Sequence, residues 1–189
     1  PGKAKLTLCL FDGGMGYRNS GLENKTYEII YDRVDIKEVQ ELNNKTFVPK
    51  GMTAMYDAIG VTIDNVYKQL KASKQKSDRV IFLIMTDGEE NSSREYDQKT
   101  VLKLIEDRQK KDKWAFLFMG ANIDTMKAGG GMGISKGNTM AYSNSGVGVN
   151  TAYRNMSASV SSFRSPGVFT KELDLSNLLA DNGVEKEKI

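Results

Sequence analysis

The sequence predicts an α/β domain with a doubly wound, mostly parallel sheet flanked by helices. Short apolar segments of strand length alternate along the chain with longer segments whose apolar residues recur at helical spacing. A chain of 189 residues with a hydrophobic share of 39% is also large enough for one domain with a single core. Sheets of this kind place their binding sites at the carboxyl ends of the strands.

Four segments are predicted to be strands, namely residues 6–11, 26–31, 79–85 and 114–119. The third and fourth are almost wholly apolar, which is the pattern of a strand buried on both faces of a parallel sheet. The second is rich in aromatic and β-branched residues, which strands favour.

Helical spacing of apolar residues predicts three helices, over residues 54–70, 100–110 and 152–163. The glycine-rich run 129–133 is interpreted as a helix terminus followed by a loop, and the polar run 142–150 as a loop.

The stretch from Pro166 onward is partly charged and carries a weaker pattern. We therefore expect one domain over residues 1–165 and a C-terminal tail over residues 166–189.

The composition excludes several classes of chemistry. The chain has no histidine, which removes Ser-His-Asp and Cys-His mechanisms and histidine-ligated zinc. Its one cysteine, Cys9, lies in an apolar run and cannot form an internal disulfide, so a structural thiol in a reducing compartment is expected.

The charge pattern and the hydropathy argue against nucleic-acid and membrane partners. The net charge is only +3, and the basic cluster at residues 108–113 is short and interrupted by an acid, as in a solvated helix end. No apolar run approaches the roughly 18 residues that cross a bilayer.

Candidate ligands for a cation stand where predicted strands end and where a helix begins. Asp12 follows the first strand, Asp87 follows the third, and Thr53 precedes the long helix, where it is suited to cap the helix. Because the carboxyl ends of parallel strands meet at one edge, Thr53 and Asp87 are expected to approach each other. Such oxygen ligands, completed by water, suit Mg²⁺ or Mn²⁺.

Several strings resemble those of von Willebrand factor type A domains, in particular the intracellular branch of bacteria and phages. They are Gly51-x-Thr53-x-x-x-Asp57-Ala58-Ile59, Thr86-Asp87-Gly88-x-Glu90-Asn91 and Gly120-Ala121-Asn122-Ile123-Asp124. The similarity covers about residues 5–164, and the combination of strings is more specific than any one of them.

The resemblance implies a metal-ion-dependent adhesion site that holds one divalent cation. It gives Thr53 and Asp87 ligand roles, while the family's Asp-x-Ser-x-Ser loop has its only counterpart in Asp12, which glycines follow. A site made of Asp12, Thr53 and Asp87 leaves most of the coordination shell to water, so weak binding is expected. The residues expected to contact a partner are Gly88, Glu89 and Asn91.

Two alignments with this family remain open. In the favoured one, residues 6–11 and 26–31 form a hairpin with residues 13–24 as an insertion at its tip, and the family's first strand is missing. In the other, Asp12 opens a degenerate metal loop, and the following helix and strand are missing. Either way the sheet lacks a strand, so completion by a strand of a partner, or by self-association, is expected.

The function that these observations favour is a non-catalytic protein-binding module in the cytoplasm of a bacterium or of a phage-infected host cell. The alternative is a structural component of a virion or other assembly that keeps the fold without binding metal. A metal-dependent phosphohydrolase ranks third, because no acid–base pair is evident and Glu89 and Glu90 are interpreted as solvent-facing or supporting groups.

Overall fold

The computed structural model describes residues 3–13, 26–48, 51–73 and 79–164. The predicted tail over residues 166–189 and nearly all of the predicted insertion over residues 13–24 lie outside these residues. The chain divides into two compact units. The hairpin unit comprises residues 2–78 and 88–104, and the parallel-sheet unit comprises residues 79–87 and 105–189 together with Pro1.

The hairpin unit is built on two antiparallel strands, β1 (Lys5–Phe11) and β2 (Tyr27–Asp35). The predicted antiparallel pairing of these two segments is therefore confirmed, and β2 runs beyond the residues 26–31 expected from the sequence. The thiol of Cys9 on β1 is half-buried, and burial raises its pKa, which is consistent with the structural role expected for it.

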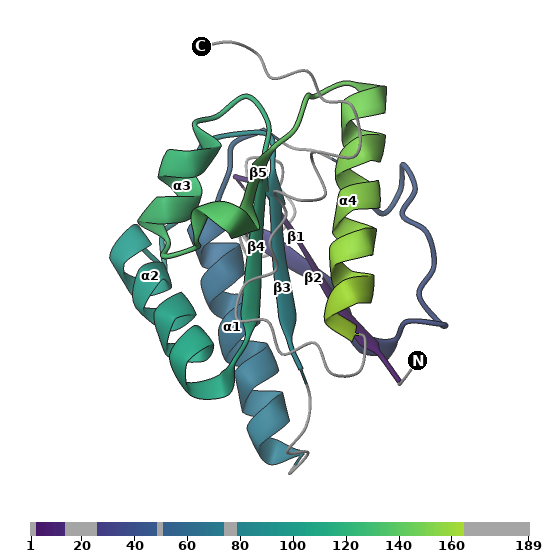
Figure 1. Cartoon of the computed structure of the whole chain (residues 1–189), viewed down its shortest axis with the longest axis vertical. Coiled ribbons are helices and arrows are strands. Elements are labelled where there is room, and N and C mark those ends of the chain that lie inside the picture. Colours follow the sequence, from purple (N-terminus) through teal and green to yellow (C-terminus); the bar gives the residue numbers. More distant parts are fainter. Residues whose placement is uncertain (1–2, 14–25, 49–50, 74–78, 165–189) are drawn as a thin grey trace, which may run out of the picture. The chain divides into compact units, whose positions relative to one another are not determined.

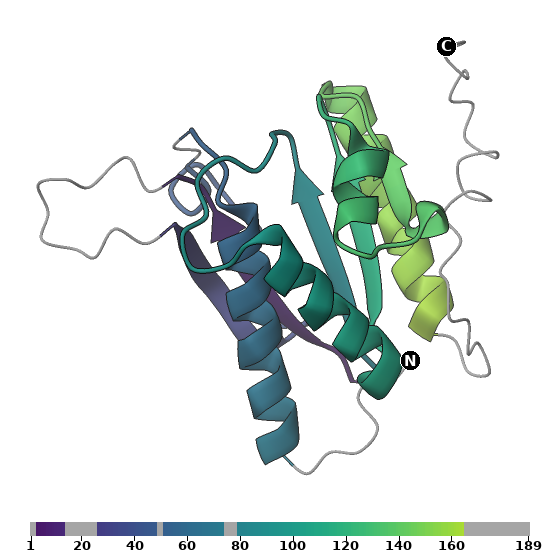
Figure 2. The same ribbon diagram turned by 90° about the vertical axis from the view of Figure 1, so that its left-hand side faces the viewer.

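Helix α1 (Met55–Ala72) packs against this strand pair, as Figure 2 shows. Its buried apolar residues recur at helical spacing, as the sequence predicts; they are Met55, Ala58, Ile59, Ile63 and Val66. Gly60 lies on the same helix under the ring of Tyr96, and a Cβ atom at position 60 would overlap that ring. Position 60 therefore has no room for a side chain while the ring stays in place.

The parallel-sheet unit contains β3 (Ile81–Thr86), β4 (Ala115–Gly120) and β5 (Thr139–Ala141), with β4 in the middle. All three strands run parallel. Every residue of β4 is buried, as expected, whereas most of β3 is only half-buried. The expectation that β3 is buried on both faces is therefore wrong for most of its length.

Helices cover both faces of this sheet (Figure 1). On one face, helix α4 (Gly146–Arg164) packs Ala152 and Phe163 against alternate residues of β4, including Leu117. On the other face, helix α3 (Thr125–Gly131) brings Gly129 into contact with β4 and β5. This alternation follows from the period of two in a strand, which sends neighbouring side chains to opposite faces.

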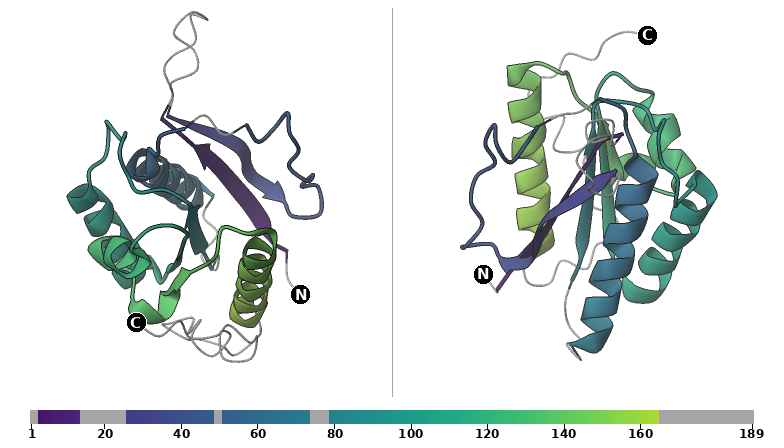
Figure 3. Two further views of the ribbon diagram at one scale, coloured as in Figure 1. Left: turned by 90° about the horizontal axis from the view of Figure 1, so that it is seen from above. Right: turned by 180° about the vertical axis from the view of Figure 1, so that it is seen from behind.

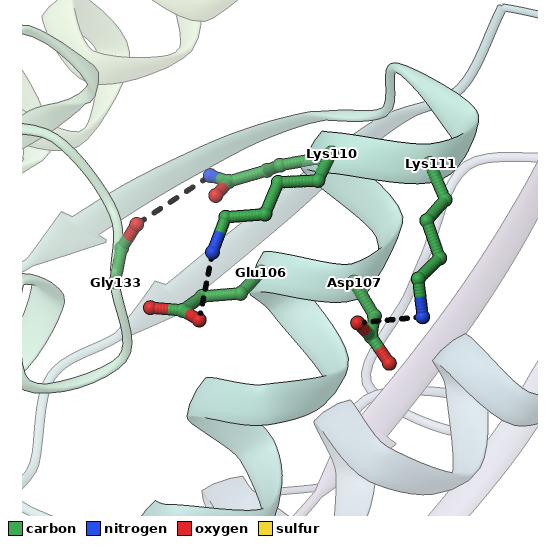
Figure 4. Close-up of polar contacts among 6 residues, drawn as sticks. Glu106, Asp107, Lys110, Lys111 and Gly133 are labelled. Atoms are coloured by element: carbon green, nitrogen blue, oxygen red, sulfur yellow. Dashed lines mark hydrogen bonds and ion pairs between the residues drawn. The ribbon is translucent and has the colours of Figure 1, made fainter.

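Helix α2 (Gln98–Asp107) begins in the hairpin unit, ends in the parallel-sheet unit and continues into a π-helical turn, η1 (Arg108–Asp112). Figure 4 shows the ion pairs here, Lys110 Nζ to Glu106 Oε2 at 3.2 Å and Lys111 Nζ to Asp107 Oδ1 at 3.0 Å. Both lysines are exposed, as expected of a solvated helix end.

The α/β class predicted from the sequence is confirmed, but three elements differ from the prediction. The described strands form two sheets, one antiparallel with two strands and one parallel with three. The sequence predicts neither strand β5 nor the start of helix α3, but α3 ends at Gly131, so the interpretation of the run 129–133 as a helix terminus followed by a loop is confirmed. Helix α4 starts at Gly146, so the run 142–150 is only partly a loop.

Replacing Gly60 by alanine is expected to lower the free energy of unfolding by about 1–3 kcal/mol, because the new methyl group displaces the ring of Tyr96. The matched control is Gly130→Ala in α3, where a Cβ atom meets nothing within 4 Å. That change is expected to be neutral or to stabilise by up to about 1 kcal/mol, since alanine favours helix over glycine. Urea denaturation of both variants measures the difference, and equal effects would contradict the packing described for Tyr96.

Candidate functional site

Three chain segments of the hairpin unit that carry predicted site residues converge. After β1 ends, the amide of Asp12 donates to the carbonyl of Thr26 at 2.9 Å, and the amide of Gly13 donates to the carbonyl of Gly51 at 3.1 Å. Gly13 is buried, and a Cβ atom there would overlap the side chain of Met52. The segment that follows Asp12 therefore lies directly against the segment that leads to Thr53.

Two hydrogen bonds join Thr53 to the loop that follows β3. Its amide donates to Oδ1 of Asn91 at 2.8 Å, and its carbonyl accepts from the amide of Asn91 at 3.0 Å. A Cβ atom at Gly88 would lie 2.8 Å from the hydroxyl oxygen of Thr53, so a larger residue at position 88 would have to displace that hydroxyl. The predicted residues Thr53, Gly88 and Asn91 thus form one cluster, to which the segment after Asp12 is bound through Gly51.

The prediction that Thr53 caps helix α1 is wrong. The residue before the helix is Ala54, and no side chain of its own segment caps the helix. Instead, Oε2 of Glu90 accepts from the amide of Tyr56 at 2.9 Å, and Oγ of Ser93 accepts from the amide of Asp57 at 3.1 Å. The free amides of the first turn are thus satisfied from a loop more than thirty residues away, and the charge of Glu90 suits the positive end of the helix dipole.

Glu90 also organises its own loop. Its Oε1 accepts from the amides of Ser92 and Ser93 at 2.9 and 2.8 Å, and its Oε2 accepts from Oγ of Ser93 at 2.8 Å. This carboxylate is therefore a supporting group, as the sequence suggested, whereas the neighbouring side chain of Glu89 is exposed. Burial raises the pKa of Tyr56, and the charge of Glu90 adds to that shift.

Asp57 holds the second half of the loop from inside the unit. Its side chain is 1% exposed. Oδ1 accepts from the amides of Glu95 and Tyr96 at 2.8 and 2.9 Å, while Oδ2 accepts from the amide of Arg94 at 2.9 Å and from the hydroxyl of Thr26 at 3.2 Å. A buried charge with four donors is well compensated. Asp57 therefore joins helix α1, the start of β2 and the loop.

Asp87, the third expected ligand, belongs to the parallel-sheet unit and is exposed at the carboxyl end of β3. Nearby in that unit, the hydroxyl of Tyr142 donates to the carbonyl of Thr86 at 3.3 Å. Burial raises the pKa of Tyr142, and the negative charge of Asp87 adds to the shift. That Asp87 and Thr53 meet stays a prediction.

The cluster offers oxygen atoms, but few of them are charged. Asp12 and Thr53 are half-buried, while Glu89 and Asn91 are exposed. Within the described residues, no group of three or more histidine, cysteine, aspartate or glutamate side chains could hold a metal ion. A cation here would depend on Thr53 and on water for much of its coordination.

Sequence reasoning assigned no role to Asp57 or Ser93, although both shape the site. Asp57 carried a readable signal, because it is an acid between Met55 and Ala58 on the apolar stripe of the long helix. A buried acid on such a stripe needs several donors. Ser93 carried no such signal, since its contact with α1 depends on how the chain folds.

Comparison with models of protein families, with curated proteins and with solved structures finds no match. Among the described residues, none of the helices combines the length and the apolar character that crossing a membrane requires.

Replacing Asp57 by asparagine is expected to lower the free energy of unfolding by about 2–4 kcal/mol, because an amide group then faces donors that the carboxylate had satisfied. The control is Asp32→Asn, which alters an exposed carboxylate with one hydrogen bond from Gln69 and is expected to cost about 0.5 kcal/mol or less. Urea denaturation measures both, and comparable losses would contradict the central role of Asp57.

The hydroxyl of Tyr96 donates to Oδ2 of Asp64 at 3.0 Å, and burial with this contact raises the pKa of Tyr96 to about 12. The unfolded tyrosine loses its proton near pH 10, so between pH 10 and 12 deprotonation favours the unfolded state. Stability contributed by Tyr96 is therefore present below pH 10 and is lost as the pH rises through 12. In urea titrations over this range, Tyr96→Phe is expected to show a shallower decline than the wild type; identical slopes would contradict the assignment.

Proposed function

We propose that the chain is a non-catalytic protein-binding module of the von Willebrand factor type A kind. The loop from Gly88 to Asn91, together with Asp87, forms its contact surface. The observation that carries this proposal is the convergence of the segments at Asp12, Thr53 and Gly88–Asn91 in the hairpin unit. Three segments that are distant in the sequence, and that carry the predicted residues Asp12, Thr53 and Gly88–Asn91, lie together there.

The loop is suited to binding because the side chains that hold it in place are not the ones expected to contact a partner. Glu90 and Asp57 accept hydrogen bonds from the amides of Ser92 and Glu95, which follow the loop in the chain, while Glu89 and Asn91 keep exposed side chains. A surface that is ordered before binding loses little conformational entropy in the complex. The exposed groups are polar and acidic, so we expect a partner surface with basic or hydrogen-bonding groups.

A weak Mg²⁺ or Mn²⁺ site accompanies this surface in the proposal, with Asp12, Thr53 and Asp87 as ligands. The hydroxyl of Thr53 lies against Gly88, and Asp87 is the residue before Gly88 in the chain. Few protein ligands leave most of an octahedral shell to water, so affinity is low, and an open position remains for a partner's carboxylate.

A structural role in an assembly is the second candidate, and the edge of the parallel sheet favours it. In the described residues, β3 is an end strand of its sheet, and its apolar residues Ile81–Met85 are mostly half-buried rather than buried. Natural sheets protect such edges. A strand of a partner, or of a second copy, would complete the sheet, as the sequence led us to expect.

Calorimetric titration of the full chain with MgCl₂ and MnCl₂ tests the metal site. We expect saturable binding with a Kd on the order of 1 mM, since most ligands are water. Asp87→Ala is expected to weaken it about tenfold or more, which corresponds to about 1.4 kcal/mol. Glu41→Ala removes an exposed carboxylate elsewhere and serves as the control. Equal affinities of the two variants would remove Asp87 from the site.

Two further measurements separate the candidates. Light scattering that finds only monomers would contradict strand completion by self-association. Release of phosphate from generic phosphomonoesters, lost in Asp87→Ala, would contradict a non-catalytic role. Absence of metal binding together with stable oligomers would support the structural alternative.

A further inference from the structure

A groove lies between strand β2 and helix α1 of the hairpin unit, separate from the cluster around Thr53. It has a volume of about 550 Å³, a size typical of ligand sites. Strand β2 contributes Tyr27–Ile29 to its wall. Helix α1 contributes one stripe of side chains, Val61, Asp64, Asn65 and Lys68, and the ring of Tyr96 completes the lining.

The lining shows that the groove lies along the edge of β2. No residue of β1 lines it, so it lies on the side of β2 that faces away from β1. The other edge of this stretch is occupied, because Tyr27, Glu28 and Ile29 pair with Phe11, Leu10 and Cys9 of β1. Among the described residues, no strand pairs with β2 on the groove side.

The dimensions fit a short extended peptide. Three residues of β2 span about 10 Å. The helical stripe from Val61 to Lys68 covers seven residue steps, which is also about 10 Å. Figure 3 shows α1 beside the pair of strands β1 and β2, and α1 contacts both strands. A groove between a strand edge and a helix is the arrangement in which proteins bind a peptide as an added strand.

Two side-chain contacts brace the groove. The hydroxyl of Tyr96 donates to Oδ2 of Asp64 at 3.0 Å, and Nε2 of Gln69 donates to Oδ2 of Asp32 on β2 at 2.7 Å. The first fixes the aromatic wall, and the second ties the helix to the strand beyond the groove. The groove therefore exists without a ligand.

The polar groups of the groove favour a basic ligand. Oδ2 of Asp64 accepts from Tyr96, and Oδ1 of Asp64 has no hydrogen bond or ion pair with any described residue. Lys68 is the only cation among the lining residues, so the lining carries a net charge of −1. The guanidinium group of an arginine side chain could donate hydrogen bonds to Asp64 and stack its flat face on a tyrosine ring.

We infer that this groove binds an extended segment of a partner protein, which pairs with the open edge of β2 and places an arginine side chain between Asp64 and Tyr96. The site is independent of the loop at Gly88–Asn91 and of any metal ion. It gives the module a second recognition surface, specific for sequence as well as for main-chain geometry.

The test is an NMR titration of the full chain with the capped peptide acetyl-Thr-Val-Arg-Val-Thr-amide. We expect shifts of the amides of Glu28–Ile30 and of Asn65. The same peptide with citrulline in place of arginine keeps the shape but removes the charge, and is expected to bind about tenfold more weakly. N-methylation of the peptide backbone beside the arginine is expected to abolish binding, because it blocks strand pairing.

Variants of the protein complete the test. Asp64→Asn is expected to remove the preference for arginine over citrulline, while Glu41→Gln, which removes an exposed carboxylate outside the groove, is expected to keep it. The arginine and citrulline peptides are compared on the same wild-type protein, so that result does not depend on whether a variant folds. Equal binding of the arginine and citrulline peptides would overturn the inference, as would shifts confined to residues 88–91. Equal affinity for arginine amide alone would also overturn it, because the groove would then be a site for a small cation.

Discussion

The buried carboxylate of Asp57 is the group on which the order of the hairpin unit's loops depends. It accepts four hydrogen bonds from two distant parts of the chain while it sits in the first turn of α1. A charge in this position cannot be left without donors, since burial removes the water that would otherwise solvate it. The loop that supplies three backbone donors is thereby bound to the helix, and Glu90 reinforces the same junction from the loop side.

This junction also holds in place the residues of both candidate surfaces, the loop at Gly88–Asn91 and the groove beside Tyr96. On one side of Asp57, the loop continues back to Asn91 and Gly88, which hold Thr53. On the other side it continues to Tyr96, whose ring lies on Gly60 and whose hydroxyl reaches Asp64. One segment therefore supports both the acidic loop and the wall of the groove.

Sequence patterns predicted the elements whose burial follows a simple period. Helix α1 has a clear apolar stripe and β4 is wholly apolar, so both were found close to their observed bounds. Helix α3 was missed because it contains three glycines in seven residues, although Asp124, which accepts from the amide of Lys127 at 3.0 Å, is a readable N-cap. Strand β5, with only three residues, is too short to show a pattern.

The site was harder to predict because its hydrogen bonds join residues far apart in sequence. Thr53 looks like a helix cap when only its neighbours are considered, yet Glu90 and Ser93 satisfy the helix amides. The paired roles of Thr53 and Asn91 likewise arise from contact between loops. Residue types and strand ends indicated where the site lies, but the partners of each side chain depend on tertiary packing that no local pattern encodes.

The contact between Arg79 and the end of α4 has a practical consequence for experiments on this protein. The guanidinium of Arg79 lies 5.3 Å from the centre of the Phe163 ring and donates to the carbonyl of Arg164 at 3.3 Å. Arg79 precedes β3 and Asp87 follows it, and the six residues of the strand separate them by about 20 Å. Tethering the protein to a sensor surface through residues beyond Arg164 would thus hold it by the amino end of β3, and would leave the acidic end of that strand accessible to an incoming binder.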